Sequence, residues 1–255
     1  MMCERATSHF APMGRIERAA LRSVLWFNRK AKRAAIRIVS LTRGQALHPK
    51  HLVGAASAWW GPFCGGRVLD VGCGTGAASR FMPFATFLVG LDRDADALNI
   101  AHGRVWRQRL NRLSADPLPV VRADLRDGLP FRDRSFETVL CHDCLEHLDD
   151  RPMLLREIRR VLVRGGRLVL GVPNGHTRWR KRLRLAGVDS RSDPDHRIEY
   201  TEAVLRRELA DGGFQITRRI PGILDTPWTG VFDRWRQRRA QQHPGDDAAF
   251  YVVCR

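Results

Sequence analysis

A glycine-rich loop that follows a short apolar run constrains this chain more than any other feature, and it reads Val68-Leu-Asp-Val-Gly-Cys-Gly-Thr-Gly76. The apolar run, residues 67–71, has the composition of a buried strand, and a helix is expected after the loop. Glycines at 72, 74 and 76 permit positive φ and let a ligand approach the backbone without meeting a Cβ atom. The loop therefore predicts a ligand-binding turn at the carboxyl end of a buried strand.

The rest of the chain alternates short apolar runs with segments of helical periodicity. Strands are predicted at residues 67–71, 86–91, 119–123, 136–141, 167–172, 214–219 and 249–254, and helices at 94–113, 152–163 and 201–210. Such alternation is typical of a parallel sheet with helices on both faces. The predicted fold class is therefore α/β, with irregular insertions at about residues 175–197 and 221–245.

The first 45 residues are predicted to be a basic extension, partly helical, ahead of a main domain at residues 46–255. Between residues 15 and 41, apolar residues recur on one side of a helix and arginines gather on the other. Such a helix could lie on an acidic membrane with Trp26 at the boundary. It could equally pack on the main domain or on a second copy of the chain, so both alternatives stay open.

The formal net charge of +17 would attract nucleic acid, acidic lipid or phosphorylated substrates. Only Lys30, Lys32, Lys50 and Lys181 are lysines, and this arginine bias would equally arise from a GC-rich coding sequence. No uncharged apolar run reaches the roughly 18 residues expected of a membrane span, and the N-terminus lacks the apolar core of a signal peptide. A cytoplasmic location is expected, with peripheral membrane contact as an alternative.

Six cysteines, at positions 3, 64, 73, 141, 144 and 254, lack the spacing of a disulfide-rich secreted domain. Cys141 and Cys144 form a single C-x-x-C pair. Because a structural zinc site needs four ligands and a second pair is absent, reduced thiols are expected.

Acidic residues accompany the ends of the first two predicted strands. Asp70 lies two residues before Gly72, where a carboxylate would repel the pyrophosphate of a dinucleotide but would suit the ammonium and sulfonium of S-adenosylmethionine. The alternative for Asp70 is a carboxylate that accepts backbone amides of the turn. Asp92 ends the second strand and could accept both ribose hydroxyls of a cofactor, whereas Asp94 and Asp96 are better placed to cap the next helix.

The third strand is followed by Asp124, which could meet the adenine amino group while Leu125 lies against the ring. An ordinary loop acid is the alternative for Asp124, since aspartate is common in turns. The predicted cofactor-binding set is completed by Cys73, Arg93 and Cys141.

Further segments occur in the order and spacing of a known family. They are Gly90–Asp92, Asp124–Phe131, Ser135–Val139, Leu145–Leu148, Leu155–Leu162 and Gly165–Asn174. Together with Val68–Gly76 they resemble the class I S-adenosylmethionine-dependent methyltransferases of the type 11 group, over about residues 64–220. The resemblance implies a Rossmann-like seven-stranded sheet whose last strand is antiparallel, with S-adenosylmethionine as the methyl donor. Glu137 departs from the family, which usually has aspartate there.

Methyl transfer requires an aligned acceptor and, when the acceptor is a hydroxyl, a base. The loop after the fourth strand offers His142, Asp143 and His147 as candidate catalytic residues, although the Glu-His pair of this family often only starts a helix. Some relatives hold a divalent metal with a Glu-x-x-Glu-His cluster, and this chain has Asp143-x-x-Glu146-His147. Because many other relatives carry a similar pair without metal, no metal is predicted.

The acceptor is expected to be a small molecule or a lipid precursor that is methylated on oxygen. Residues 172–174 and the helix start near Tyr200 resemble ubiquinone-biosynthesis-type O-methyltransferases. The insertion at residues 177–184 could cover a phosphorylated or lipid-linked acceptor. Trp228, Phe232 and Trp235 could add to such a lid, or these aromatic residues could be core residues beneath solvated arginines.

Three other functions are weighed against this one. An RNA or protein methyltransferase would use the same cofactor site and contact phosphate with its arginines. A non-catalytic protein could retain the cofactor fold alone. An NAD-dependent oxidoreductase is disfavoured by Asp70 and by the downstream motifs.

Overall fold

The computed structural model describes residues 60–82, 84–110, 119–191, 193–220, 222 and 245–255, with isolated positions at 14, 16, 17, 19, 20, 23, 239 and 242. Most of the basic extension lies outside the described residues, and so do Trp26 and the predicted lid residues Trp228, Phe232 and Trp235. Within the described part of the chain, no helix is long and apolar enough to cross a membrane.

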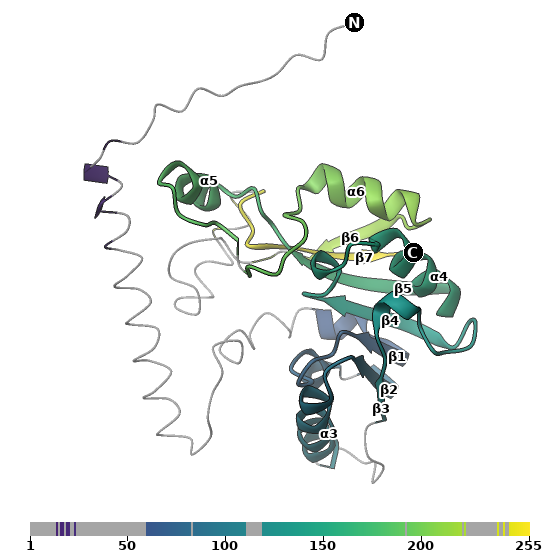
Figure 1. Ribbon diagram of the computed structural model, residues 1–255. Helices are drawn as coiled ribbons and strands as arrows, with labels where there is room; N and C mark the ends of the chain where they lie inside the picture. The colour runs from purple at the N-terminus through teal and green to yellow at the C-terminus, as the bar shows by residue number, and fades with distance from the viewer. Residues whose placement is uncertain are drawn as a thin grey trace, which may run out of the picture.

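Seven strands form one sheet in the order β3-β2-β1-β4-β5-β7-β6 (Figure 1). Their bounds are β1 Gly65–Val71, β2 Phe84–Asp92, β3 Val120–Arg122, β4 Phe136–His142, β5 Leu162–Pro173, β6 Ile216–Ile220 and β7 Ala249–Cys254. The pairs formed among β1 to β5 are parallel, whereas β7 is antiparallel to both β5 and β6. The Rossmann-like sheet and its antiparallel last strand are thus confirmed.

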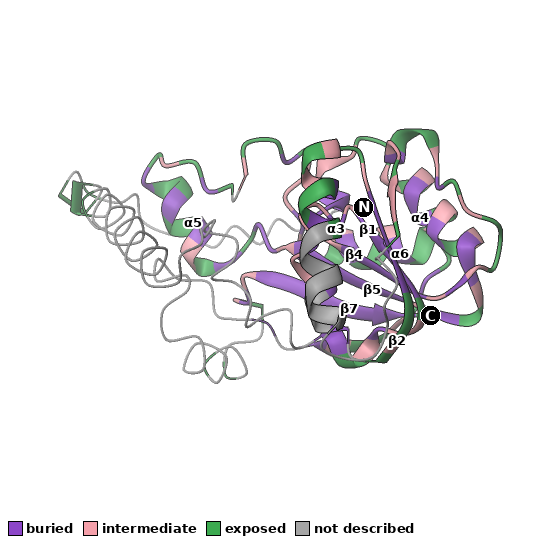
Figure 2. Ribbon diagram, turned by 90° about the horizontal axis from the view of Figure 1, so that it is seen from below, coloured by how far each residue is buried: buried purple, intermediate pink, exposed green. Residues whose placement is uncertain are grey.

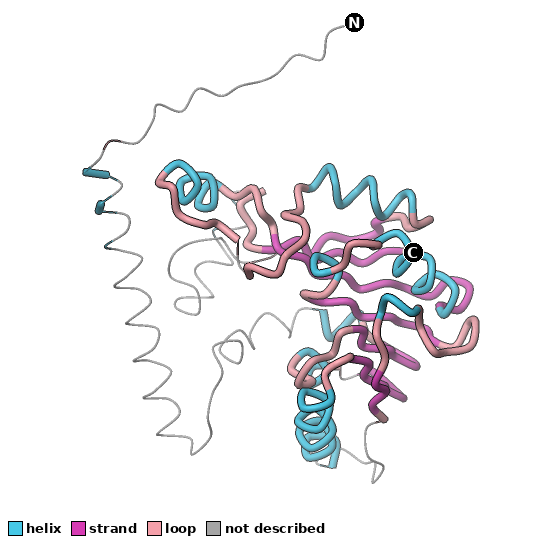
Figure 3. The backbone as a smooth tube through the Cα atoms, in the orientation of Figure 1, coloured by secondary structure: helices cyan, strands magenta, loops and turns pink. Residues whose placement is uncertain are grey.

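Helices lie on both sides of this sheet (Figure 3), and its central strands are buried (Figure 2). The helices α4 Arg151–Val161 and α6 Glu202–Asp211 cover one face, where Leu154, Ile158 and Leu205 join the core. The opposite face is covered by Trp60, Met82 and the short turn η2 Gly61–Phe63. The helix α3 Ala95–Leu110 packs beside β2 and β3.

Side-chain caps fix where the helices begin. The Asp150 carboxylate accepts the Met153 N–H at 3.0 Å at the start of α4, and Pro152 occupies the first turn, where its missing N–H costs nothing. Thr201 caps α6 in the same way through the Val204 N–H, at 3.1 Å. These caps place the start of each helix within one residue of the predicted start.

The structure corrects three sequence predictions. After Gly76 there is only a 3-10 turn, η3 Ala78–Phe81, because β2 begins at Phe84 and leaves too few residues for a longer helix. The helix predicted at 152–163 ends at Val161, because Leu162 is extended and pairs with Phe136 as the first residue of β5. The insertion near 175–197 is not wholly irregular. It contains α5 Arg178–Leu185, which the Thr177 hydroxyl caps at the Arg180 N–H, at 3.1 Å.

The helix α5 lies beyond the carboxyl end of β5, apart from α4 and α6 (Figures 1 and 2). The buried Asn174 amide fixes the turn that leads to α5, since it donates to the Gly245 and Asp247 carbonyls at 2.9 and 3.0 Å. The insertion therefore leaves the sheet at the edge where parallel strands end, which is where ligands bind in this class of sheet.

Candidate functional site

A cavity of about 510 Å³ lies where β1 to β4 end. It is lined by Gly72, Asp92, Arg93, Ala123, Asp124, Leu125, Arg126, Asp143, Cys144, His147, Leu148, Asp149, Asp195 and Arg197. A volume of this size is ordinary for a small-molecule site. The lining includes carboxylates at 92, 124, 143, 149 and 195 but arginines only at 93, 126 and 197, so the cavity favours a cationic ligand.

Gly72 of the glycine loop lines this cavity, whereas Gly74 and Gly76 do not. All three glycines have positive φ: +68° at Gly72, +51° at Gly74 and +73° at Gly76. A Cβ atom on Gly72 would lie 2.7 Å from the Sγ of Cys144, so this glycine lets the loop after β4 pack closely. A Cβ on Gly74 would meet no heavy atom within 4 Å. The space beside Gly74 is therefore open to a ligand.

Asp92 is held against this loop. One carboxylate oxygen accepts the Gly74 N–H at 2.7 Å, and the other accepts the Asp94 N–H at 3.0 Å. The helix cap belongs to Asp94, which accepts the Asp96 and Ala97 N–H groups at 2.9 and 3.1 Å. Asp92 lines the cavity. Because each of its carboxylate oxygens can accept a further hydrogen bond, Asp92 can bind a pair of ribose hydroxyls.

Asp70 lies beneath the loop and outside the cavity lining. Its side chain is buried and accepts a hydrogen bond of 2.5 Å from the Ser79 hydroxyl. Burial raises the pKa of Asp70 to about 7, partly opposed by that hydrogen bond. Among the described groups, Asp70 therefore accepts its hydrogen bond from a side chain and not from the backbone amides of the glycine turn.

Asp124 and Leu125 both line the cavity. The Asp124 carboxylate already accepts the Arg126 guanidinium at 2.6 Å and the Arg126 N–H at 3.0 Å, and these bonds hold its pKa well below the usual range. A cofactor adenine would therefore meet an aspartate that Arg126 already orients.

The remaining predicted cofactor residues lie around the loop but do not line the cavity. Cys73 and Cys141 are buried free thiols, and a Cβ on Gly90 would lie 2.8 Å from the Cys73 Sγ. Burial raises the pKa of the Cys73 thiol, with Asp70 adding to the shift. All five cysteines in the described part of the chain are free.

The three candidate catalytic residues separate in space. His142 packs against both Trp60 and Tyr251, with ring centroids 4.3 and 5.7 Å away, and does not line the cavity. Asp143 lines it in a left-handed backbone conformation with φ of 48°. This conformation is uncommon outside glycine, and such positions cluster at functional sites.

His147 lines the cavity as well, and its ring meets the ring of His196 edge to face at 4.8 Å. Glu146 is fully buried beside them, and neither of its carboxylate oxygens has a hydrogen-bond partner in the described part of the chain. Burial raises the pKa of Glu146 to about 8. Sequence reasoning missed His196 as a site residue, because no local spacing relates it to the loop after β4.

This group of side chains could hold a divalent cation. Glu146, His147 and His196 each offer one ligand atom, and these atoms all lie within 4.8 Å of one another. One carboxylate and two imidazoles leave a further position open, as at many metal sites. Asp143 lies outside this group, so the donor set differs from the one that the sequence spacing suggested.

Comparison with known proteins agrees with this fold and site. Residues 69–170 match a family described as "Methyltransferase domain". The chain is 30% identical over 200 residues to 27-O-demethylrifamycin SV methyltransferase of Amycolatopsis mediterranei, covering 74% of this chain and 69% of that protein. It is 31% identical over 175 residues to ubiquinone biosynthesis O-methyltransferase of Xanthomonas euvesicatoria, covering 64% and 68%.

The fold is similar to that of magnesium protoporphyrin IX methyltransferase from Synechocystis, whose crystal structure contains SAH. The TM-score is 0.56 at 19% identity, covering 81% of this chain and 85% of that one. Sheet order, glycine loop and acidic cavity together define a Rossmann-like enzyme of the S-adenosylmethionine-binding class. The chain belongs to the S-adenosylmethionine-dependent methyltransferases, and S-adenosylmethionine is its methyl donor.

Proposed function

We propose that the protein methylates a hydroxyl oxygen of a small molecule or lipid precursor, with His147 as the general base. The observation that carries the proposal is the place of His147, which lines the cofactor cavity and is backed by His196. The ubiquinone relative is named an O-methyltransferase, and the name of the rifamycin relative includes a 27-O-demethyl compound. Both names favour oxygen as the methylated atom.

When bound, S-adenosylmethionine supplies a methyl group whose bond to sulfur breaks as the bond to the acceptor oxygen forms, leaving the electron pair on sulfur. His147 takes the hydroxyl proton, so the acceptor oxygen carries no positive charge after transfer. The carboxylates of Asp143 and Asp149 line the same cavity. Asp143 is the second candidate base for the same proton.

The segment before α6 borders the same cavity, and we assign the acceptor to this side of it. Asp195 and Arg197 line it, and the Arg197 N–H donates to the Glu146 carbonyl at 2.8 Å. This hydrogen bond ties the segment to the loop that carries His147. The acceptor is thereby held where a base and the methyl group can both reach it, which is the main demand of this reaction.

The test is an acceptor screen with purified protein, S-adenosylmethionine and four substrate classes: simple catechols, a polyprenylated phenol, primary amines, and RNA oligonucleotides. Release of S-adenosylhomocysteine is measured. The proposal predicts turnover with a hydroxyl acceptor and its loss in His147→Ala. Turnover with RNA or amines alone, or turnover that does not depend on His147, would contradict it.

A further inference from the structure

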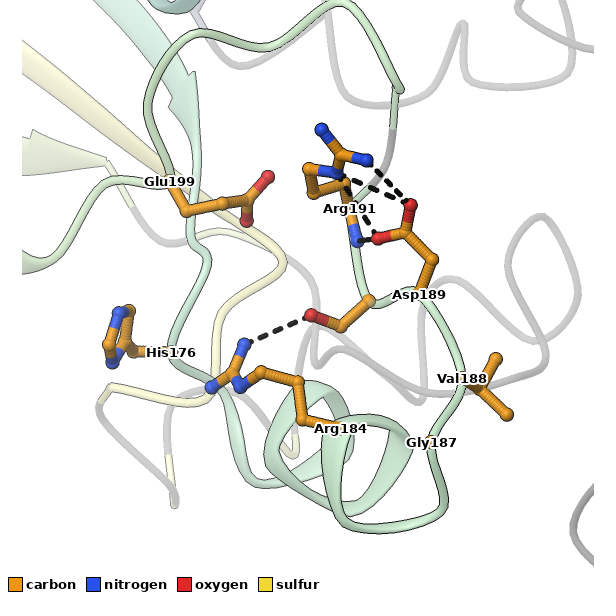
Figure 4. A pocket seen from close by; sticks show the side chains of 8 residues that line it. His176, Arg184, Gly187, Val188, Asp189, Arg191 and Glu199 are labelled. Carbon is orange, nitrogen blue, oxygen red and sulfur yellow. Dashed lines mark hydrogen bonds and ion pairs between the residues drawn. The ribbon is translucent and has the colours of Figure 1, made fainter.

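A second cavity, of about 630 Å³, lies beside α5 and is separate from the cofactor cavity in its lining residues (Figure 4). Its polar lining consists of His176, Arg184, Asp189, Ser190, Arg191 and Glu199. Figure 4 shows Arg184 pointing into this space from α5 and Glu199 pointing into it from the segment before α6. The charges on these side chains decide what the cavity can bind.

Both acids that line this cavity are already paired with cations. The Asp189 carboxylate accepts the Arg191 guanidinium at 3.0 Å, and this pairing lowers the pKa of Asp189. One oxygen of Glu199 lies 3.3 Å from Nη1 of the buried Arg180, and the other lies 3.3 Å from Nδ1 of His196. Neither carboxylate is therefore free to balance a further cation.

Arg184 is the cation in this lining that has no carboxylate partner among the described residues. Its Nη1 donates to two neutral acceptors, the Gly175 carbonyl at 2.8 Å and the Ser190 hydroxyl at 3.0 Å. These two bonds orient the guanidinium while its charge stays uncompensated, and its other N–H groups can donate to an oxyanion.

The groups next to Arg184 also indicate a positive electrostatic potential in this cavity. The pKa of His176 is lowered, first by burial and then by the positive charges of Arg184 and Lys181, whereas Glu199 raises it. Lys181 is exposed on the same helix. An anion placed here would oppose this potential and would be held by charge-assisted hydrogen bonds.

We propose that the cavity beside α5 binds a phosphoryl group through the guanidinium of Arg184. The group is either the phosphate of a soluble molecule or the headgroup phosphate of a lipid. Planar guanidinium donors match the oxygens of phosphate in spacing and direction, which favours phosphoryl over a simple halide.

The position of this cavity relates it to methyl transfer. Asp195 and Arg197 line the cofactor cavity, whereas Glu199 lines the phosphoryl cavity, so one short segment borders both. The phosphoryl group then belongs to the methyl acceptor, and this assignment rests on the proposed function. Binding of phosphate itself does not rest on it.

The experiment is a titration of the full-length protein with inorganic phosphate, followed by NMR of the His176 ring, which His176→Gln assigns. Phosphate is expected to shift the His176 signal to saturation and to raise the His176 pKa. Arg184→Gln should weaken phosphate binding about 10- to 100-fold, the effect of losing hydrogen bonds to a charged group. Lys181→Gln should weaken it less. Arg182→Gln is the matched control, because Arg182 lies on the same helix but does not line the cavity, and it should leave binding unchanged.

A wild-type protein that shows no saturable shift, or equal binding by Arg184→Gln and Arg182→Gln, would overturn the proposal. If Arg184→Gln fails to fold, Ser190→Ala removes one of the bonds that orient the guanidinium and is expected to weaken binding in its place. Flotation with phosphatidylcholine vesicles containing phosphatidylglycerol separates the two sources. Flotation that depends on Arg184 assigns the group to a lipid, and phosphate binding without flotation assigns it to a soluble molecule.

The phosphate titration and the acceptor screen keep the two proposals distinguishable. Phosphate binding with no methylation of any hydroxyl acceptor would leave the phosphoryl cavity standing and sink the proposed function. Hydroxyl methylation without phosphate binding would do the reverse.

Discussion

The Nε2 atom of His196 lies 3.9 Å from Oε1 of Glu146, which joins the segment before α6 to the loop after β4. Glu146 is fully buried and His196 nearly so, and both are adjacent to His147. A buried polar group without a hydrogen-bond partner is costly, so this arrangement implies a purpose at the site beyond packing. Holding the His147 ring at the cavity wall is the role that agrees with the proposed function.

Replacement of His147 by alanine should lower kcat about 10²- to 10⁴-fold, because the acceptor hydroxyl would lose its base. Affinity for S-adenosylhomocysteine should stay within about twofold of wild type, because the base is assigned to the acceptor and not to the cofactor. His196→Phe keeps an aromatic ring but loses the contacts with Glu146 and Glu199, and it should lower kcat by a smaller factor. Thermal melting of each variant is the control, and a loss of stability that accounts for the lost turnover would show that His147 is structural.

Asp70 gives a pH dependence of stability in the absence of cofactor. Its folded-state pKa, about 7, is above the ordinary value of 3.8, so the folded protein retains a proton that the unfolded chain releases. Stability from this group is fully present below the unfolded pKa and is lost as the pH rises through 7. Between pH 5 and pH 8, wild type should lose about 2–3 kcal/mol of unfolding free energy relative to Asp70→Asn, measured by urea denaturation. Parallel pH curves for the two proteins would show that Asp70 does not titrate in this range.

The glycine loop offers a matched pair of variants. Gly72→Ala combines positive φ with a Cβ 2.7 Å from the Cys144 Sγ, so it should destabilise folding by about 1–3 kcal/mol. Gly74→Ala places its methyl group in open space, so the protein should fold with a smaller loss and bind S-adenosylhomocysteine at least about tenfold more weakly. Melting temperatures and calorimetry measure the two effects.

A second substitution checks the cause of the first effect. Cys144→Ala removes the Sγ atom and should recover part of the stability that Gly72→Ala loses, because the closest contact is then gone. If Gly74→Ala binds S-adenosylhomocysteine like wild type, the open space beside Gly74 is not the cofactor site.

The sheet was predictable because its strands are short apolar runs that local composition reveals, and Asp94 was predictable as a cap because it precedes a helical pattern. The cofactor-binding residues were predictable because Gly72, Asp92 and Asp124 each lie at or just after the carboxyl end of a parallel strand. The helix α5 was missed because its arginines hide the apolar periodicity, although Leu183 is buried. The pairing of Glu146 with His196 depends on tertiary packing, which no spacing in the sequence encodes.

His142 was predicted as a candidate base from its position in the sequence, but tertiary packing places it away from the cavity. Its place next to Asp143 made it a candidate base, but the alternation of side chains along β4 turns its ring toward Trp60 and Tyr251. Gly171 makes room for that packing, because a Cβ there would lie 2.5 Å from the His142 ring.

Calorimetric titration with S-adenosylhomocysteine and with NAD tests the central claim most directly. Wild type should bind S-adenosylhomocysteine and not NAD, and Asp92→Ala should weaken that binding by about 1.5–3 kcal/mol, the range for hydrogen bonds to a charged group. Asp94→Ala is the matched control, because it removes the α3 cap and should cost about 1 kcal/mol of stability without changing affinity. Tight binding of NAD, or unchanged affinity for S-adenosylhomocysteine in a folded Asp92→Ala protein, would contradict the account.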